Sequence, residues 1–125
     1  MKFLRILTFA FGALFSAHVT QAQEAAPKAK TAAEQVQIKT SAVCDMCKTR
    51  LEKAMAYEKG VQSAVLDVPT QMLTVQYRAG KTTPDALRAA VAATGYDADQ
   101  QTANAKAYDR LPECCKKTNA IHGAD

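Results

Sequence analysis

The chain has 125 residues, of which 16 are Lys or Arg and 12 are Asp or Glu, giving a formal net charge of +4. This length supports one small domain rather than two. Two of the basic residues, Lys2 and Arg5, lie in an N-terminal segment. The remaining charge is close to balanced and shows no clustered basic face, which argues against a nucleic-acid binder.

The first segment, residues 1–22, has the order of a secretory signal peptide. Basic residues precede an apolar run over residues 6–15, and small residues follow up to Ala22. The apolar run is too short to span a hydrocarbon core of ~30 Å, which argues against a membrane anchor. We therefore expect an exported protein that is cleaved after Ala22. A flexible leader over residues 23–34, without apolar periodicity, is expected to follow.

The next segment predicts a strand, a cysteine-containing loop and a helix. Val36 and Ile38 alternate with polar residues from residue 35 onward, which is the period of a half-buried strand. After the loop "CDMC", residues 46–58 predict a helix with an apolar stripe formed by Leu51, Ala54 and Met55. A glycine, Gly60, stands just past the end of this helix, as is common at helix C-termini.

Two strands and a second helix are predicted next. The strands cover residues 61–68 and 72–78, and the turn "PTQ" joins them as a hairpin. The residues expected to face inward alternate along both strands: Ala64, Leu66, Val68, Leu73, Val75 and Tyr77. The second helix covers residues 82–95, with Thr83 as its cap, a proline at its first position and Gly95 at its end.

Residues 96–102 predict a short fourth strand, and residues 103–110 predict one or two further helical turns. The resulting order β-α-β-β-α-β is that of the ferredoxin-like plan. We therefore expect an α+β fold over residues 35–102. Its two layers are a four-stranded antiparallel sheet and two helices on one face of that sheet. Residues 103–125 are expected to form an irregular C-terminal tail that carries a second cysteine pair.

Cys44 and Cys47 stand where the first strand gives way to the first helix. Unpaired N–H groups at the start of a helix carry positive partial charge and favour thiolates, which are the metal-binding form of cysteine. Lys48 is expected to add positive charge beside them. Two convergent sulfurs without a nearby histidine suit a soft ion of low coordination number, such as Cu(I), over a hard ion.

This arrangement resembles the heavy-metal-associated domain over residues 35 to about 100. That family includes copper chaperones, the N-terminal modules of metal-transporting P-type ATPases and periplasmic mercuric-ion binding proteins. Its signature, Gly-Met-x-Cys-x-x-Cys, corresponds here to "SAVCDMC", in which both cysteines match while Ser41 and Ala42 replace the glycine and the methionine. Tyr96, which follows Gly95, matches a position whose aromatic ring often packs near the metal in bacterial members.

The resemblance implies a periplasmic metal carrier rather than an enzyme. In it, Cys44 and Cys47 hold the ion by two thiolates, while Tyr96 supports the metal loop. From its own place in the loop, Met46 is a further candidate for supporting the site. Cu(I) is the first candidate ion, Hg(II) the next, and Zn(II) is less favoured. The implied partner is a metal-transporting membrane protein, such as a P-type ATPase or a mercuric transporter, which receives the ion by ligand exchange. The carrier is expected to be a monomer, with a metal-bridged dimer as the alternative.

Other roles for the first cysteine pair stay open. Thioredoxin-type enzymes also place C-x-x-C at the start of a helix. Their fold needs a longer chain, however, and the carboxylate of Asp45 in the spacer opposes a lowered thiol pKa. Exported proteins also often carry inert disulfides. The alternative function is therefore a small exported thiol-disulfide oxidoreductase or a redox-responsive adaptor.

The tail pair, Cys114 and Cys115, is vicinal, and adjacent cysteines rarely bridge each other without backbone strain. Three interpretations stay open. The pair could add thiolates to the ion at Cys44 and Cys47, form a separate thiol site that passes the ion on, or make disulfides with the first pair. A closed four-cysteine zinc site is disfavoured, because such sites usually show C-x-x-C twice. His122 is a further candidate ligand, although a lone histidine in a tail is more often solvated.

Overall fold

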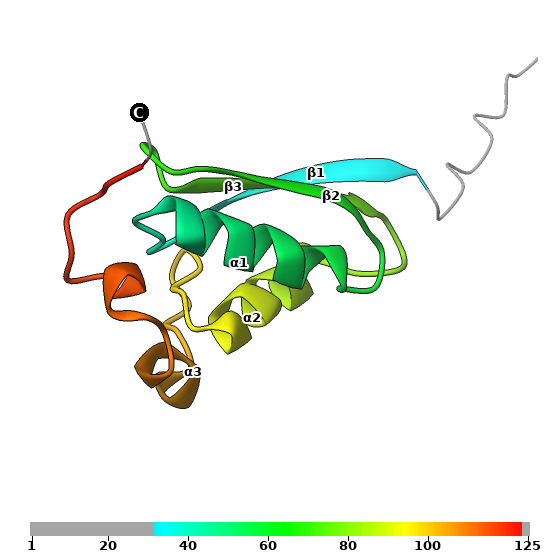
Figure 1. Ribbon diagram of the computed structural model, residues 1–125. Coiled ribbons are helices and arrows are strands. Elements are labelled where there is room, and N and C mark those ends of the chain that lie inside the picture. Colours follow the sequence, from blue (N-terminus) through cyan, green and yellow to red (C-terminus); the bar gives the residue numbers. More distant parts are fainter. Residues whose placement is uncertain (1–31, 124–125) are drawn as a thin grey trace, which may run out of the picture.

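The computed structural model describes residues 32–123, and the predicted signal peptide lies outside these residues, as does the leader up to residue 31. The elements follow in the order β1 (Ala33–Lys39), α1 (Asp45–Ala56), β2 (Val61–Asp67), β3 (Met72–Arg78), α2 (Pro84–Thr94), α3 (Ala105–Asp109) and the 3₁₀ turn η1 (Glu113–Cys115). They form two layers, because α1 and α2 lie side by side against one face of the sheet (Figure 1). No helix in this part of the chain is long and apolar enough to cross a membrane.

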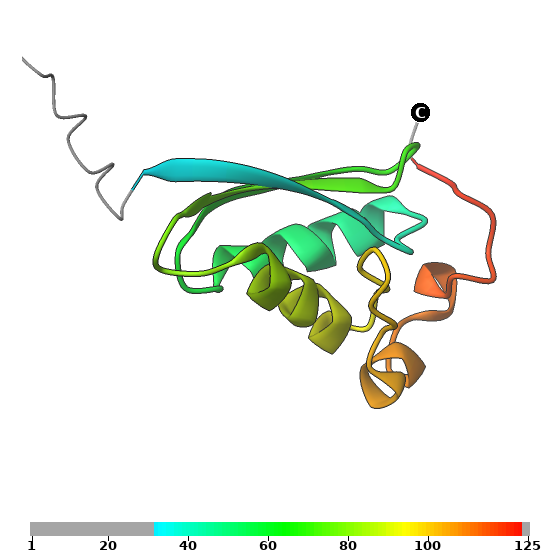
Figure 2. The ribbon, with the colours of Figure 1, turned by 180° about the vertical axis from the view of Figure 1, so that it is seen from behind.

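The central strand of the sheet is β3, which pairs antiparallel with β1 on one side and with β2 on the other. Alternation decides which side chains face the helices, as the sequence predicts. The buried inward-facing residues are Ile38, Leu66, Val68, Leu73, Val75 and Tyr77. Polar residues between them face away from the two helices, on the side of the sheet that lies uppermost in Figure 2. The hydrophobic core therefore lies between the sheet and the helix pair.

The first strand begins earlier than predicted, at Ala33 instead of residue 35. Ala33 pairs with Arg78, and Glu34 pairs with Tyr77. The Tyr77 hydroxyl also donates a hydrogen bond of 2.8 Å to Oε2 of Glu34. The predicted leader is therefore wrong at its last two residues, because pairing with β3 orders a segment that has no apolar periodicity of its own.

The buried face of α1 is set by residues that stand four apart and so lie above one another on the helix. These residues are Cys47, Leu51 and Met55. Leu51 and Met55 confirm the predicted stripe, whereas Ala54 is only partly buried. Cys47 extends the same stripe by one turn toward the N-terminus of α1. The first turn of this helix thus directs a sulfur atom into the core.

The second helix, α2, confirms the capping signals in the sequence. Oγ1 of Thr83 accepts a hydrogen bond of 3.2 Å from the N–H of Ala86. At the other end, Gly95 has a φ of +106°, a left-handed conformation that favours glycine. A Cβ at Gly95 would also lie 2.9 Å from the carbonyl carbon of Ala107. Gly95 therefore ends the helix, lets α3 pack closely and positions the residue that follows, Tyr96.

The fourth strand predicted over residues 96–102 does not form in the described chain, which has a three-stranded sheet. Ala98 makes an isolated antiparallel bridge with Thr40, just beyond the end of β1. The chain then turns back, because Ala98 and Gln101 exchange backbone hydrogen bonds of 2.9 Å and Asp99 has a φ of +52°. The carboxylate of Asp99 accepts a hydrogen bond of 2.9 Å from the Lys39 N–H, in place of a strand carbonyl. The prediction failed because this tight turn and its side-chain hydrogen bond replace ladder pairing; the α+β ferredoxin-like arrangement is otherwise confirmed.

The C-terminal tail is more ordered than predicted. Oδ1 of Asn104 caps α3 by accepting a hydrogen bond of 3.0 Å from the N–H of Ala107. Beyond α3, Leu111 and Cys115 are buried and belong to the same core cluster as the sheet and helices. The last described residues run from η1 back past the start of α1 toward the turn between β2 and β3 (Figures 1 and 2). The tail therefore packs against the end of the domain that carries the cysteine loop.

Candidate metal centre

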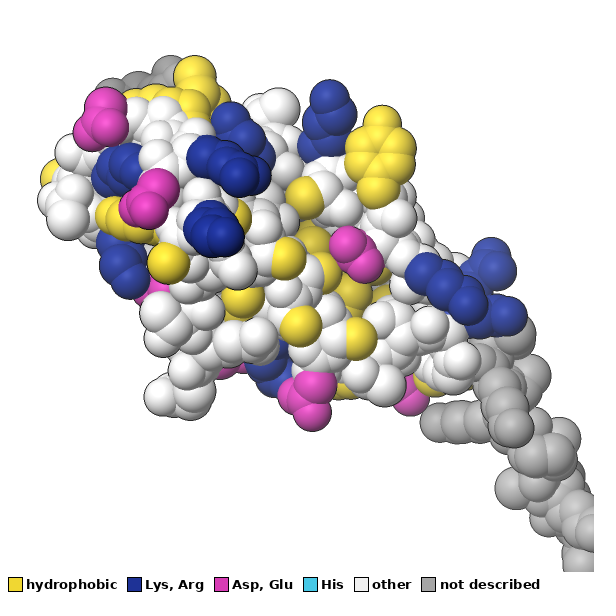
Figure 3. Space-filling view, turned by 90° about the horizontal axis from the view of Figure 1, so that it is seen from below, with side chains coloured by type: hydrophobic (Ala, Val, Ile, Leu, Met, Phe, Trp, Pro, Cys, Tyr) yellow, Lys and Arg dark blue, Asp and Glu magenta, His cyan; other side chains and the backbone are white. Residues whose placement is uncertain are grey.

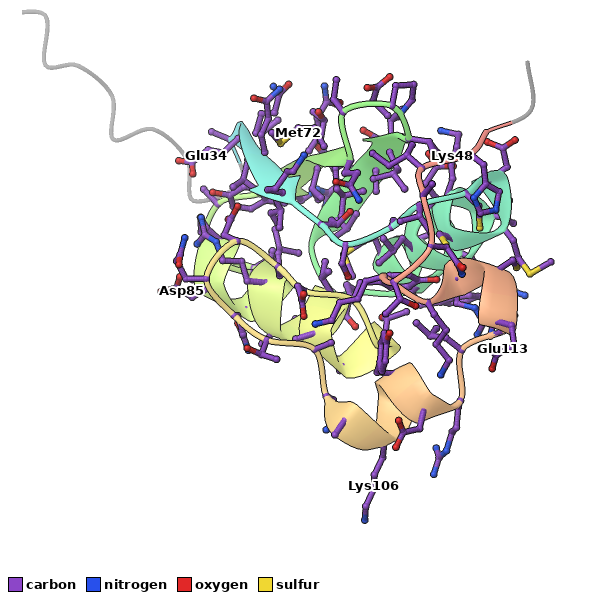
Figure 4. All side chains as sticks on the ribbon, turned by 90° about the vertical axis from the view of Figure 1, so that its left-hand side faces the viewer. Glu34, Lys48, Met72, Asp85, Lys106 and Glu113 are labelled. Carbon is purple, nitrogen blue, oxygen red and sulfur yellow. The ribbon has the colours of Figure 1, made fainter. Side chains whose placement is uncertain are left out.

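Three segments meet at one end of the molecule: the loop after β1, the first turn of α1 and the turn η1 (Figure 4). In that view Lys48 of α1 and Glu113 of η1 lie on the same side of the molecule. Each of the three segments contributes one buried cysteine: Cys44, Cys47 and Cys115. The fold thus brings together residues from the middle and from the end of the chain.

The sulfur atoms of these cysteines form a compact group. The Sγ atoms of Cys44 and Cys47 are 3.0 Å apart, and the Sγ atoms of Cys44 and Cys115 are 3.6 Å apart. All three lie within 4.8 Å of one another. The cysteines are free thiols, and none is more than 4% exposed. We call these three residues the buried thiol site.

The ligand types at the buried thiol site are uniform. Among the described residues, no histidine or carboxylate joins this group of candidate ligands. His122, the candidate ligand in the tail, is exposed, and its Nδ1 lies 2.7 Å from the carbonyl oxygen of Ala120. A site of sulfur atoms alone can hold a soft cation, and it suits a hard cation poorly.

The three thiols differ in how readily they ionise. Burial opposes ionisation of Cys47, but hydrogen bonds from the Cys44 thiol, the Val43 backbone and the Cys115 thiol lower the pKa of Cys47 overall. Burial, followed by the neighbouring Cys47 thiol, raises the pKa of Cys44. Burial also raises the pKa of Cys115, again with the Cys47 thiol as the next cause. Of the three thiols, Cys47 is therefore the one that the surrounding groups help to ionise.

Tyr96, which is expected from the sequence to support the metal loop, lies fully buried beneath this site. Its hydroxyl makes no hydrogen bond of ordinary geometry within the described part of the chain. Burial, and then the nearby thiols of Cys115 and Cys47, raise the pKa of Tyr96 well above its usual range. The Tyr96 side chain is thus neutral and packs in the core, with its hydroxyl close to the sulfurs of Cys115 and Cys47.

The loop that carries "SAVC" is held by contacts from several elements, although Ser41 and Ala42 depart from the family signature. The side chain of Gln71 donates a hydrogen bond of 2.9 Å to the Ala42 carbonyl. Oγ of Ser41 accepts one of 2.9 Å from the N–H of Asp97. The N–H of His122 donates one of 2.7 Å to the Val43 carbonyl. Hydrogen bonds from the hairpin turn, the loop after α2 and the tail therefore fix this loop.

Lys48 does not act as the sequence predicts. Its Nζ pairs with Oε1 of Glu52 at 2.5 Å and donates a hydrogen bond of 2.8 Å to the carbonyl of Leu66. Oε1 of Glu52 in turn accepts a hydrogen bond of 2.8 Å from the N–H of Leu66. The expected positive charge beside the thiols is therefore engaged in joining α1 to the edge strand β2.

The remaining predicted residues, Cys114 and Met46, lie outside the buried thiol site but close to it. The Sγ of Cys114 is 4.0 Å from the Sγ of Cys115 and 3.8 Å from the Sδ of Met46. Met46 is 52% exposed, and Cys114 is half-buried. The vicinal pair is thus divided: Cys115 points into the core and Cys114 toward the surface.

The sequence named Cys115 as a candidate but could not place it beside the first pair. The burial of Cys47 could have been predicted, because Cys47, Leu51 and Met55 stand four residues apart and so share one face of the helix. The position of the tail depends instead on contacts far apart in sequence. Lys117 pairs with Asp97 at 3.0 Å, and Leu111 packs into the core beside η1.

This chain is similar to several known metal-related proteins and domains. Residues 37–97 match the heavy-metal-associated domain. A copper-exporting P-type ATPase of Staphylococcus epidermidis is 30% identical over 92 residues, which cover 72% of this chain and 12% of that protein. The solved CopZ metallochaperone aligns with a TM-score of 0.50 and 27% identity, covering 52% of this chain and 98% of that one. Oxidized MerP from Ralstonia metallidurans CH34 aligns with a TM-score of 0.52 and 25% identity, covering 54% and 96%.

Residues 37–97 therefore belong to the heavy-metal-associated domain family. Domains of this family bind heavy metals and are typically not catalytic. The chain corresponds to only a small part, 12%, of the P-type ATPase. Cys114 and Cys115 lie beyond residue 97, where the family match ends. The third cysteine of the buried thiol site is thus an addition to the matched domain.

Proposed function

We propose that this protein carries a soft metal ion, Cu(I) in the first place and Hg(II) next, at the buried thiol site. The observation that supports the proposal is the convergence of Cys44, Cys47 and Cys115, three free thiols from three segments. Thiolates favour soft ions, and this chain is similar to a copper-exporting P-type ATPase and to the CopZ metallochaperone. Zn(II) is a weaker candidate, because structural zinc normally takes four ligands.

The spacing of the sulfurs suits a three-coordinate ion. Metal–sulfur bonds of about 2.3 Å, the value for zinc thiolates, place three ligands around one planar ion about 4 Å apart. The Sγ of Cys44 lies 3.0 Å from that of Cys47 and 3.6 Å from that of Cys115. The thiols would move apart by about 1 Å or less on binding. Side-chain rotation at the loop can supply this movement without rebuilding the fold.

The ion would leave by ligand exchange with a membrane transporter. An ion held by two or three thiolates retains an open coordination position, where an incoming sulfur can attach before a bound sulfur departs. A metal-transporting P-type ATPase or a mercuric transporter is the proposed recipient, in the periplasm after export. The carrier would act as a monomer, with a metal-bridged dimer as the alternative.

The test is a Cu(I) titration of the reduced protein against a chromophoric Cu(I) chelator, under anaerobic conditions. We expect tight binding of one ion per chain and strong loss of affinity in the double variant Cys44→Ser, Cys47→Ser. Parent-like affinity in that variant would refute the proposal. Disulfide reductase activity that survives metal chelation would favour the alternative function, a small thiol-disulfide oxidoreductase.

A further inference from the structure

Two sulfur atoms outside the buried thiol site extend it to the molecular surface. From the Sδ of Met46, the distance to the Sγ of Cys114 is 3.8 Å, and from there to the Sγ of Cys115 it is 4.0 Å. The row continues with 3.6 Å from Cys115 to Cys44 and 3.0 Å from Cys44 to Cys47. Met46 at one end of the row is 52% exposed and Cys114 is partly exposed, whereas the three inner cysteines are at most 4% exposed.

We propose that Met46 and Cys114 form an outer sulfur site through which a soft cation enters and leaves the buried thiol site. This inference rests on the proposed function, because it requires that the buried thiols bind such an ion. It adds a step to that function: the ion is handed between sulfurs of one chain before it meets a partner.

The burial of the inner thiols makes such a step necessary. Ligand exchange requires an incoming sulfur to reach the ion before a bound sulfur leaves. Cys47 and Cys115 are 0% exposed and Cys44 is 4% exposed, so a ligand from another protein has little access to an ion between them. Cys114 is the adjoining sulfur with partial exposure, and Met46 lies beyond it at the surface.

The distances permit transfer along the row. Two metal–sulfur bonds of about 2.3 Å, placed in line, span about 4.6 Å between their sulfur atoms. Each neighbouring pair in the row lies closer than that, with 4.0 Å between Cys114 and Cys115 as the largest separation. One ion can therefore be shared by each pair in turn without losing sulfur ligation.

The two kinds of sulfur ligand suit different steps: a thioether at the surface suits entry of the ion, and buried thiolates suit its retention. The Met46 thioether is neutral and soft, so it can bind a soft cation at the surface without first losing a proton. Cys114 can then bind as a thiolate, releasing its proton to solvent, and the bond from the ion to the neutral Met46 sulfur breaks. When Cys115 takes over, its thiol loses a proton, the new metal–sulfur bond forms and the bond to Cys114 breaks as that sulfur is reprotonated. The ion keeps its oxidation state throughout.

The surroundings of Met46 leave room for a donor to approach. Met46 borders an open surface hollow on α1 that is also lined by Ala54 and Tyr57. Tyr57 is 81% exposed. Figure 3 shows the helix-covered face with hydrophobic side chains across its middle and Lys and Arg side chains toward both of its ends. A donor that reaches this face could deliver an ion to Met46 without displacing buried structure.

The experiment measures transfer rates. Cu(I) is delivered from a chromophoric chelator to the reduced protein in a stopped-flow instrument, and the reverse transfer is followed with excess chelator. In the double variant Met46→Leu, Cys114→Ser we expect both rates to fall by about tenfold or more, while their ratio changes by less than about threefold. The matched control is Met72→Leu, which removes a thioether at the start of β3, away from the thiols.

Two results would overturn distinct claims. Unchanged rates in the double variant, with affinity intact, would refute the outer site and leave the proposed function standing. If the parent itself fails to bind Cu(I) through Cys44 and Cys47, the proposed function and the outer site both fail.

A second measurement detects the outer site directly. In protein labelled at methionine methyl groups, substoichiometric Cu(I) should shift or broaden the signal of Met46 and leave those of Met55 and Met72 in place. The effect on Met46 should disappear in Cys114→Ser. A Met46 signal that does not respond at any Cu(I) ratio would contradict the outer site.

Discussion

The Sγ of Cys115 lies 3.6 Å from the Sγ of Cys44, although 71 residues separate them in the chain. The tail thereby covers the loop that carries Cys44 and Cys47, the two cysteines of the heavy-metal-associated signature. If the buried thiol site binds metal as proposed, the third sulfur changes both coordination and access.

Replacing Cys115 by serine should weaken Cu(I) binding without abolishing it. Loss of an outer-shell partner typically costs about 10- to 100-fold in metal affinity, and loss of a direct ligand should cost at least as much. The measurement is a competitive chelator titration. Glu113→Gln is the matched control, because Glu113 is exposed in the same 3₁₀ turn. Equal affinities for Cys115→Ser and the parent would show that two thiolates bind the ion alone.

The variant Tyr96→Phe separates packing from electrostatics. The Tyr96 hydroxyl is buried without a hydrogen bond of ordinary geometry, so its removal should change the free energy of unfolding by about 1 kcal/mol or less. Tyr96 is also among the groups that lower the pKa of Cys47. Thiolate absorbance followed against pH should therefore show a higher pKa for the first thiol to ionise. An unchanged titration curve would show that the hydroxyl has no electrostatic effect on the thiols.

Gly95→Ala should destabilise the protein and disturb the site together. The left-handed φ of +106° is strained for alanine, and its Cβ would lie 2.9 Å from the Ala107 carbonyl. We expect a loss of about 1–3 kcal/mol in the free energy of unfolding, measured by urea denaturation. Displacement of the adjacent Tyr96 should also reduce Cu(I) affinity. Gly80→Ala is the control, since Gly80 also has a positive φ, +84°, in the connection between β3 and α2. It should lose stability but retain affinity.

Asp99 should make stability depend on pH in the acid range. Burial acts to raise the pKa of Asp99, but hydrogen bonds from Arg88 and from the Lys39 N–H outweigh it and hold this pKa below its usual value. A carboxyl whose pKa is lowered by folding stabilises the folded state above its unfolded pKa of about 3.9, and this contribution is lost as the pH falls through the folded value.

The variant Asp99→Asn tests this dependence, and asparagine tolerates the positive φ of +52° at this position. We expect it to lower the free energy of unfolding by about 1 kcal/mol near neutral pH and to have no effect at about pH 2. The control is Asp85→Asn: Asp85 also pairs with Arg88, but its side chain is 95% exposed, so its replacement should have a smaller effect. A destabilisation by Asp99→Asn that persists at low pH would contradict the assignment.

The sequence predicted most of the fold because its signals are local. Alternating residues in β2 and β3 specify the inner face of the sheet, and Thr83 and Gly95 mark the ends of α2. The prediction of a strand over residues 96–102 was wrong. The residue pattern there is compatible with a strand, but the Asp99 side chain stabilises a turn. The hydrogen bond from the Lys39 N–H to Asp99 favours the turn over the strand. The sequence pattern could not predict this contact, because the two residues are 60 positions apart.

The candidate site divides in the same way. C-x-x-C between a strand and a helix, followed by Tyr96 after a helix-ending glycine, was sufficient to single out Cys44 and Cys47, because those positions are set by local geometry. The location of Cys115 was decided by tertiary structure alone. Burial of Leu111, the Lys117–Asp97 pair and the bond from the His122 N–H to Val43 draw the tail onto the loop. Contacts between segments so far apart leave no periodic signal in the sequence, and only the folded chain brings the third sulfur to the other two.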